Sequence, residues 1–498
     1  MPGLEEHYGL GTELHLRNSS PEGHMAENIG NSPTANAAAA QSSTTTAVIR
    51  RMTYTEVLDG SPLSGLLFLV VFGVAVAQIL DGIDFQSTSF ALPLIVREFK
   101  LTPAFAGALG STTNLGVMIG ALLSGLLSDR FGRKPILQWI LFTYSFGTFL
   151  SAVAWSYQFL LIARFIAGLG IGAEFPVAFA LLAEYSPKRL RHILVPLGPL
   201  FYSVGWICCA LLATVVIPKL GWRGIYWVGV TPALMIIYVR RFMPESVRYL
   251  LHKGRIKEAG EITRRIADRA GFADVELVPP EMAYAERKPS VAEQLHSLRQ
   301  FTLTVIVLGF FYLAFHIQNV GFNAWLPSIF VKQGFTLLRS YAFTTFSLLV
   351  VPVGQLGAMW LQDKLPRKWA MLLLAGIASC FFFAVGLSFE MKYSITVIVA
   401  CAVAYQFFSN AIVPILITLN AELFPTRVRG LGIGLVSAFS RTGSIVGPLA
   451  MGLFMSFGTA IHQIIYYFAV PLAIMAIVGA IFIKVDSRQK ALEQVTGS

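Results

Sequence analysis

The sequence predicts an all-α membrane protein whose twelve transmembrane helices form two pseudo-symmetric halves of six helices each. Three observations predict this class. Of the 498 residues, 55% are hydrophobic and only 13% are charged, about half the charged share of a soluble domain. The hydrophobic residues also fall in blocks of about twenty, the length at which a helix spans a bilayer. Finally, two charged motifs recur at matching places in both halves. This composition excludes a soluble enzyme.

Twelve hydrophobic segments follow a polar N-terminal segment. Residues 1–60 are low in complexity and lack the apolar core of a secretory signal, so we expect a disordered cytoplasmic tail. The expected membrane-spanning segments are 64–95, 105–127, 135–154, 157–183, 192–216, 223–243, 302–330, 340–361, 368–388, 393–421, 431–457 and 462–483. The polar segment between the sixth and seventh divides the chain into domains 61–243 and 300–485, joined by a cytoplasmic linker, 244–299, and followed by a cytoplasmic tail, 486–498.

The positive charge predicts the orientation in the membrane. The formal net charge is +11, and the even-numbered connections carry most of the basic residues between the spans, among them Arg130, Arg133, Lys134, Lys188, Arg189, Lys364, Arg367 and Lys368. By the positive-inside rule both termini and the linker are cytoplasmic in a cell (inner) membrane. The positive charge therefore indicates how the protein is oriented in the membrane, and we expect no nucleic-acid partner. The four cysteines have neither metal-ligand nor disulfide spacing, and we expect no metal and no cofactor.

Two charged loops repeat. Ser128-Asp-Arg-Phe-Gly-Arg-Lys134 after the second span aligns with Gln362-Asp-Lys-Leu-Pro-Arg-Lys368 after the eighth. Ala183-Glu-Tyr-Ser-Pro-Lys-Arg-Leu-Arg191 after the fourth aligns with Ala421-Glu-Leu-Phe-Pro-Thr-Arg-Val-Arg429 after the tenth. Two loops repeated at nearly one offset indicate duplicated halves, an arrangement in which transporters bind substrate between the halves near the membrane midplane.

The loop Gly125-Leu-Leu-Ser-Asp-Arg-Phe-Gly-Arg-Lys134 resembles the signature loop of the major facilitator superfamily, and Arg164-Phe-Ile-Ala-Gly-Leu-Gly-Ile-Gly172 resembles its fourth-helix motif. The resemblance covers residues 60–485 and implies the major facilitator fold. Pro244-Glu-Ser-Val-Arg-Tyr-Leu resembles a motif of its sugar-porter-like branches. Asp81-Gly-Ile-Asp84 resembles the aromatic acid:proton symporters, and Ser440-Arg-Thr-Gly-Ser-Ile-Val-Gly-Pro448 resembles organic-anion and nicotinate transporters.

Ionisable residues inside the spans are candidates for proton coupling, because a charge at this depth costs roughly 2.5–3.5 kcal/mol on insertion scales. Asp81 and Asp84 share one helix face, so one of them could carry the exchangeable proton; alternatively, one caps a break at Gly82. Glu174 could be the partner of Arg164, a second proton site or a cavity acid. In relatives, the arginine matching Arg164 is assigned to helix contacts or proton transfer.

Arg441 is the main candidate for substrate binding. It lies about ten residues, roughly 15 Å, into the eleventh span, and a guanidinium fork suits a carboxylate. The alternative is a structural salt bridge. Repeat symmetry places His316 and Asn319 opposite Asp81 and Asp84, and Asn323 continues their face. His316 could also be a hydrogen-bonded packing residue.

Further side chains could form the walls around an aromatic ring. The candidates at interior depth are Tyr202, Trp206, Phe315, Tyr405 and Gln406. Each of them could instead serve only helix packing.

The loop after the second span predicts a conformational latch between the halves. Asp129 is expected near the positive N-terminus of the eleventh span, which would stabilise its carboxylate by about 0.3–1 kcal/mol. Together with Arg133, Glu184 and Arg189 it would favour the outward-facing state. A solvated loop that only fixes topology is the alternative. In the second copy Pro366 replaces Gly132, which weakens the match there.

The sequence thus predicts a monomeric, proton-coupled secondary transporter that imports a small organic anion, an aromatic or heteroaromatic carboxylate, by alternating access. It predicts no enzyme activity. A sugar or polyol porter and an organic-cation carrier remain as alternatives, as does a receptor on the same fold that does not transport. Arg441 would have no role in the first, and the second would have to tolerate its charge.

Overall fold

The computed structural model describes residues 51–61, 65–194, 197–269, 272, 275–279, 291–424 and 428–482, and helices dominate them. Nine helical stretches among these residues are long and apolar enough to span a membrane. One of the nine, Leu197–Phe242, is broken at Gly221 (φ 69°), in the predicted gap between the fifth and sixth spans, so it supplies two. With α4 (Arg133–Ala152) and α17 (Arg429–Ser456), the described helices supply the twelve predicted spans.

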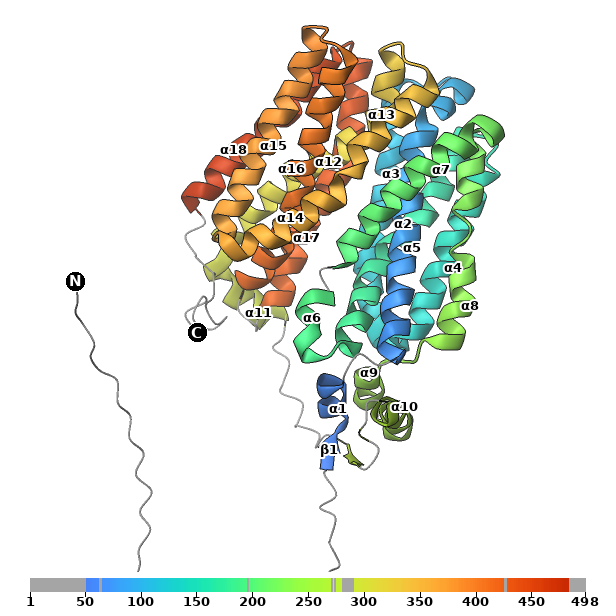
Figure 1. Ribbon diagram of the computed structural model, residues 1–498, viewed down its shortest axis with the longest axis vertical. Coiled ribbons are helices and arrows are strands. Elements are labelled where there is room, and N and C mark those ends of the chain that lie inside the picture. Colours follow the sequence, from blue (N-terminus) through green and yellow to red (C-terminus); the bar gives the residue numbers. More distant parts are fainter. Residues whose placement is uncertain are drawn as a thin grey trace, which may run out of the picture. The chain divides into compact units, whose positions relative to one another are not determined.

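These helices form two bundles (Figure 1). The first contains α2 (Gly65–Phe99), α3 (Pro103–Phe131), α4, α5 (Tyr157–Tyr185), α7 (Leu197–Val228) and α8 (Ala233–Phe242). The second contains α12 (Thr302–Lys332), α13 (Leu337–Leu349), α14 (Val351–Lys364), α15 (Arg367–Glu390), α16 (Ile395–Glu422), α17 and α18 (Ile461–Phe482). The predicted span 340–361 is therefore two helices, α13 and α14, which meet at Val350. Pro352 lies in the first turn of the second helix, a position that suits proline because its nitrogen has no intrahelical acceptor there.

Shorter elements cluster at one end of the bundles. They are α6 (Lys188–Leu194), α9 (Val247–His252), α10 (Ile256–Arg269), β2 (Glu276–Val278), α11 (Val291–Leu298) and the 3₁₀ turn Arg299–Phe301. We call this the linker end, and we call the opposite end, which carries the α2–α3 and α17–α18 turns, the far end. Residues 51–60 also lie at the linker end, as β1 (Arg51–Thr53) and α1 (Tyr54–Gly60) (Figure 1).

The prediction of disorder is wrong for residues 51–60. Thr53 and Glu56 form a reciprocal capping box that starts α1, and β1 pairs in parallel with β2, with Arg51 opposite Glu276. Their side chains make an ion pair of 2.8 Å. The pairing partner lies more than 200 residues away, so local composition does not reveal it. Residues 1–50 of the predicted tail, and 486–498, lie outside the described residues.

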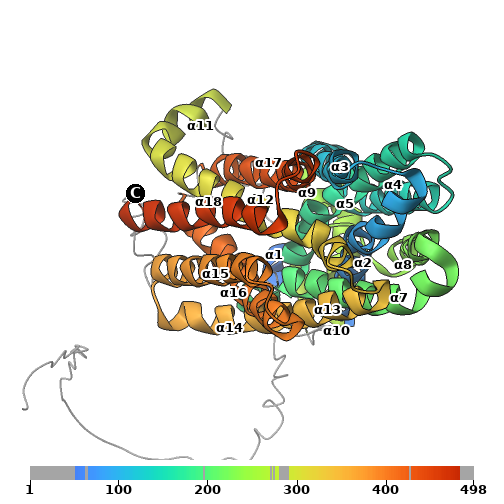
Figure 2. The ribbon, with the colours of Figure 1, turned by 90° about the horizontal axis from the view of Figure 1, so that it is seen from above.

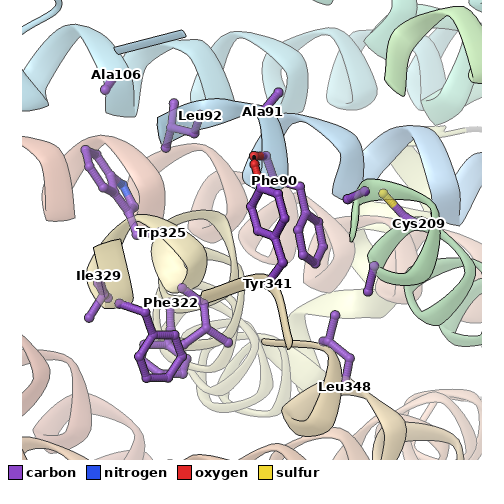
Figure 3. Packing of buried hydrophobic residues seen from close by; sticks show 14 of the residues in the cluster. Phe90, Ala91, Leu92, Ala106, Cys209, Phe322, Trp325, Ile329, Tyr341 and Leu348 are labelled. Carbon is purple, nitrogen blue, oxygen red and sulfur yellow. Dashed lines mark hydrogen bonds between the residues drawn. The ribbon is translucent and has the colours of Figure 1, made fainter. Parts of the chain in front are cut away.

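Among the described residues, the two bundles share a hydrophobic core at the far end and not at the linker end. Figure 3 shows this cluster, in which Phe90 and Leu92 of α2 lie near Phe322 and Trp325 of α12 and Tyr341 of α13. Hydrogen bonds reinforce it: Ser89 Oγ donates to the Asn323 carbonyl at 2.6 Å, and Tyr341 Oη donates to the Phe90 carbonyl at 2.6 Å. Seen from above, α17 lies against α3, and α13 lies beside α2 and α7 (Figure 2).

At the linker end each bundle has a core of its own. One apolar cluster contains residues such as Leu308, Met371 and Leu419 of the second bundle. Another joins Val70 and Ile140 of the first bundle to residues of α1, α9 and α10. The glycines follow the same division. A Cβ atom added at Gly107 of α3 would meet the backbone of α17, whereas one added at Gly125 of α3 or at Gly430 of α17 would meet no other part of the described chain within 4 Å. The bundles are therefore packed at the far end and separated at the linker end.

Candidate functional site

A cavity of about 230 Å³ lies between the bundles. Its walls come from α2, α3, α5 and α7 of the first bundle and from α12, α14, α16 and α17 of the second. The volume is below the roughly 300–1,000 Å³ of sites for drug-sized ligands. The cavity therefore suits a small metabolite.

Aromatic rings form the wall from the first bundle. Phe85 of α2 stacks at 15° on Trp206 of α7, with ring centres 6.5 Å apart, and lies 5.9 Å from Tyr202. Phe175 of α5 meets Tyr202 edge-on at 5.4 Å. All four rings line the cavity, as expected for Tyr202 and Trp206. Offset and edge-on arrangements are favourable between aromatic rings, and a flat ring of a ligand could extend this cluster.

Arg441 lines the opposite wall, together with other polar side chains. It belongs to α17 and makes no hydrogen bond or ion pair with any described residue. A structural salt bridge, the alternative considered for Arg441, is therefore absent from the described part of the chain. Other polar residues that line the cavity are Asn114 and Ser203 of the first bundle, and His316, Asn319, Gln355, Asn410, Ser440 and Ser444 of the second.

His316 is anchored at both ring nitrogens. Nδ1 lies 2.8 Å from the Tyr312 carbonyl and Nε2 lies 3.0 Å from Ser440 Oγ. Because a carbonyl only accepts, Nδ1 carries the proton, and in the neutral ring Nε2 accepts from the serine. His316 lines the cavity, and its two hydrogen bonds also fix it in the packing of the helices. The hydrogen bond to this ring holds Ser440, the residue that precedes Arg441, in place.

Amide side chains connect α12 with α16. Asn319 Nδ2 donates to Ser409 Oγ at 3.2 Å, Asn323 Nδ2 donates to the Asn319 carbonyl at 2.9 Å, and Gln406 Nε2 donates to Asn323 Oδ1. Asn319 lines the cavity, and Asn323 lines a smaller pocket beyond it, toward the far end. The network fixes the orientation of these amides.

Two of the sequence candidates for substrate binding, Tyr405 and Gln406, line neither the cavity nor the smaller pocket. Tyr405 is fully buried against Phe322 and Phe382, with ring centres 5.4 and 4.6 Å away. Gln406 is fully buried and turned toward Asn323. The face of α16 that lines the cavity instead carries Asn410, Val413 and Ile417.

Asp84 and Arg164 form a fully buried ion pair. Arg164 Nη1 and Nη2 donate to Asp84 Oδ1 and Oδ2 at 3.2 and 2.8 Å, a bidentate arrangement. Thr148 Oγ1 also donates to Asp84 Oδ1, at 3.0 Å, and the guanidinium lies 5.1 Å from the centre of the Tyr226 ring. Asp84, not Glu174, is thus the partner of Arg164, and α2, α4, α5 and α7 meet at this point.

Asp81 and Glu174 lie side by side, and neither has a basic partner among the described residues. Both are fully buried, and α2 continues unbroken through Gly82, so neither aspartate caps a helix break. Gln78 Nε2 donates to Glu174 Oε1 at 3.4 Å. Glu174 Oε2 and both carboxyl oxygens of Asp81 have no hydrogen-bond partner among the described residues. An uncompensated buried charge is costly, so a proton on either acid would stabilise the pair.

This geometry can be compared with that of known proteins. The model of the family described as "Sugar (and other) transporter" matches residues 39–496. The chain belongs to this family. It is a multi-pass membrane transporter of the major facilitator superfamily and not an enzyme.

Relatives along nearly the whole chain transport small molecules. The transporter is 30% identical over 446 residues to the niacin transporter NiaP of Acinetobacter baylyi, covering 88% of this chain and 98% of that protein. It is 28% identical to the 4-hydroxybenzoate transporter PcaK of the same organism, covering 86% and 93%. The partially occluded, inward-open xylose transporter XylE from E. coli has the same fold, with a TM-score of 0.67 at 19% identity, covering 86% and 100%. The predicted major facilitator fold is confirmed.

The predicted latch residues are only partly brought together. Arg133 pairs with Asp129 at 3.0 Å and with Glu184 at 3.5 Å. Asp129 is 73% exposed, and no contact of its side chain with α17 is present among the described residues. Arg189 is exposed. Asp129 therefore does not engage the other bundle while the linker end is open.

The second copy of the loop reproduces one of these contacts. Arg367 pairs with Glu422 at 2.8 Å, as Arg133 does with Glu184 in the first copy. The backbone differs, since Gly132 has φ +103° and Pro366 has φ −52°. The repeat is thus visible in the side-chain contacts although the turn is not the same.

Several polar residues of the site were not predicted from the sequence. Asn114, Gln355 and Asn410 line the cavity, and Gln355 Oε1 accepts from Ser203 Oγ of the other bundle at 3.0 Å. Glu245 was also missed: its Oε1 accepts from the backbone nitrogens of Arg133 and Lys134 at 3.0 and 3.3 Å, at the start of α4. Uncharged amides within hydrophobic spans are the signal that would have found the first three.

Proposed function

We propose that this chain is a proton-coupled symporter that imports a small aromatic or heteroaromatic carboxylate by alternating access. The observation that carries the proposal is Arg441, a cation without an ion-pair partner among the described residues, in a cavity whose other wall is aromatic. A guanidinium binds a carboxylate through two parallel hydrogen bonds. The rings of Phe85, Tyr202 and Trp206 suit the flat face of the same ligand.

The relatives support this substrate class. Niacin and 4-hydroxybenzoate, the substrates in the names of NiaP and PcaK, are both small rings that bear a carboxyl group. A sugar would leave the charge of Arg441 without a counter-charge. An organic cation would need acids in the cavity, yet Asp81, Asp84 and Glu174 are not among its lining residues.

Packing at one end supports alternating access. In secondary transporters two halves rock around a central site, and here the described residues of the two halves share a core at the far end alone. We propose that the linker end is cytoplasmic, following the positive-inside rule. Both termini would then be cytoplasmic in an inner membrane, and this structure would be the inward-open state of a monomer.

We assign the proton to the pair Asp81 and Glu174. The two acids lie behind the aromatic wall, because Glu174 precedes Phe175 in α5 and Gly82 of α2 packs against the backbone of Tyr202. Protonation of this pair would offset the negative charge of the substrate. Asp84 is the weaker candidate, since Arg164 already compensates it.

Asp81→Asn and Glu174→Gln are expected to abolish uphill accumulation driven by a pH gradient, because an amide cannot bind the exchangeable proton. Exchange of labelled substrate across the membrane should persist, since it needs no net proton movement. Proteoliposomes with an imposed pH gradient measure both activities. The matched control is Gln318→Leu, at a fully buried position that does not line the cavity. Normal accumulation by both amide variants would refute the assignment.

Asp129→Asn is expected to shift the transporter further toward the inward-open state without changing which acids it recognises. The carboxylate would close the linker end only when α17 approaches it. Cysteines placed at Gly125 and Gly430, which face open space here, report the opening by their rate of alkylation. Unchanged alkylation in the Asp129→Asn background would show that the residue only fixes topology.

A further inference from the structure

A side pocket adjoins the central cavity on the side of the far end. The two share Phe85, Asn114 and Val320 in their walls. The side pocket measures about 40 Å³, room for about three water-sized groups. It can therefore take a substituent of a ligand but not a second ring.

Gln86 provides an unused hydrogen-bond donor in this pocket. It follows Phe85 in α2, is 2% exposed and lines the side pocket. Its Nε2 has no hydrogen-bond partner among the described residues. A buried amide without a partner costs roughly 1–3 kcal/mol, so a ligand atom that accepts from it would be favoured.

The other polar groups of the pocket are already engaged. Thr113 Oγ1 donates to the Leu109 carbonyl, Asn114 Nδ2 donates to the Gly110 carbonyl, and Ser89 Oγ donates to the Asn323 carbonyl. Asn323 Nδ2 donates within its own helix, and its Oδ1 accepts from Gln406. Thr88 Oγ1, which also lines the pocket, accepts from Tyr226 Oη at 3.2 Å. Gln86 Nε2 is thus the buried side-chain donor of this pocket that has no partner among the described residues.

The side pocket lies at the right level for the far side of a ring held by Arg441. Pro448 of α17 lines the side pocket and Arg441 lines the main cavity. They are seven positions apart, which corresponds to about 10 Å along the helix axis. This distance leaves room for one aromatic ring, with its carboxylate at one end and a polar atom at the other.

We propose that Gln86 selects aromatic acids whose ring carries a hydrogen-bond acceptor away from the carboxylate, either a hydroxyl oxygen or a ring nitrogen. This inference rests on the proposed function and narrows its substrate class. A site that hydrogen-bonds a polar group discriminates against the analogue lacking it, because the protein group is then left unpaired. An unsubstituted ring should accordingly bind more weakly.

The test compares benzoate with 4-hydroxybenzoate and with pyridine-3-carboxylate on purified transporter, by competition against a labelled acid. The wild type should bind at least one acceptor-bearing acid more tightly than benzoate. Gln86→Leu should weaken the binding of that acid about three- to tenfold, which corresponds to the loss of one neutral hydrogen bond. It should weaken the binding of benzoate less than twofold. A loss for 4-hydroxybenzoate would indicate that a hydroxyl enters the pocket, and a loss for pyridine-3-carboxylate would indicate a ring nitrogen at the mouth of the pocket.

Two further variants make the result decisive. Gln86→Met keeps the length of the side chain, so it replaces Gln86→Leu if that variant does not insert. Gln318→Leu is the matched control, because Gln318 is also fully buried and unpartnered but lines neither cavity. Equal losses for all three acids in the Gln86 variants, or a wild-type preference for benzoate, would overturn the inference and leave the proposed function intact. Binding of none of the acids by the wild type would instead refute the proposed function.

Discussion

Asp84→Asn is expected to lower the free energy of unfolding by about 3–5 kcal/mol, because it leaves the guanidinium of Arg164 buried without its counter-charge. The hydrogen bond from Thr148 to the same carboxylate does not compensate a charge. Arg164→Gln should be similarly damaging, since it leaves the carboxylate alone. Thermal unfolding of purified protein in detergent measures both effects.

A double-mutant cycle separates the ion pair from other effects of the substitutions. Asp84→Asn combined with Arg164→Gln should be less destabilising than the sum of the single variants, because no unpaired charge remains. The control is Glu258→Gln, which breaks an ion pair whose side chains are 52% and 51% exposed and should cost less than about 1 kcal/mol. If Asp84→Asn unfolds at the wild-type temperature, the buried pair does not hold the first bundle together.

The fold was largely predictable because each span carries its own signal. Hydrophobic length fixes the number of helices, and the loops at 128–134 and 362–368 reveal the duplication. Two local features were not predicted correctly. Residues 51–60 form β1 and α1 through a partner strand at Glu276–Val278, a distant contact that composition does not reveal. The break at Val350 lies inside an uninterrupted hydrophobic stretch.

The candidate site was predictable in part. Depth along a helix follows from residue number, which is why Arg441, His316 and Asn319 could be placed at the level of the cavity. The face that a helix presents depends on its neighbours, and Tyr405 and Gln406 are for this reason turned away from the cavity. Which residue pairs with a buried charge likewise depends on how the helices pack.

The pairing of charges illustrates this limit. Arg164 and Asp84 are 80 positions apart, and counting acids against cations indicates only that some acid lacks a partner. The structure shows which acids these are: Asp84 is paired with Arg164, whereas Asp81 and Glu174 lie together with no cationic partner among the described residues. Gln86, with its unused donor, was missed because an uncharged residue did not enter the count.

Arg441→Gln is expected to weaken the binding of an aromatic carboxylate about ten- to a hundredfold. The loss corresponds to a hydrogen bond to a charged group, worth roughly 1.5–3 kcal/mol. Arg441→Lys should recover little, because an ammonium group cannot form the two parallel bonds. Both variants should unfold near the wild-type temperature, since Arg441 has no bonded partner among the described residues.

The most direct test of the account measures the affinity of an acid and its neutral amide, such as pyridine-3-carboxylate and pyridine-3-carboxamide, for wild type and for folded Arg441→Gln. If Arg441 binds the carboxylate, the substitution lowers the affinity for the acid ten- to a hundredfold and leaves the affinity for the amide nearly unchanged. An equal loss for both ligands, or no loss for the acid, would contradict the assignment of Arg441 to the substrate carboxylate.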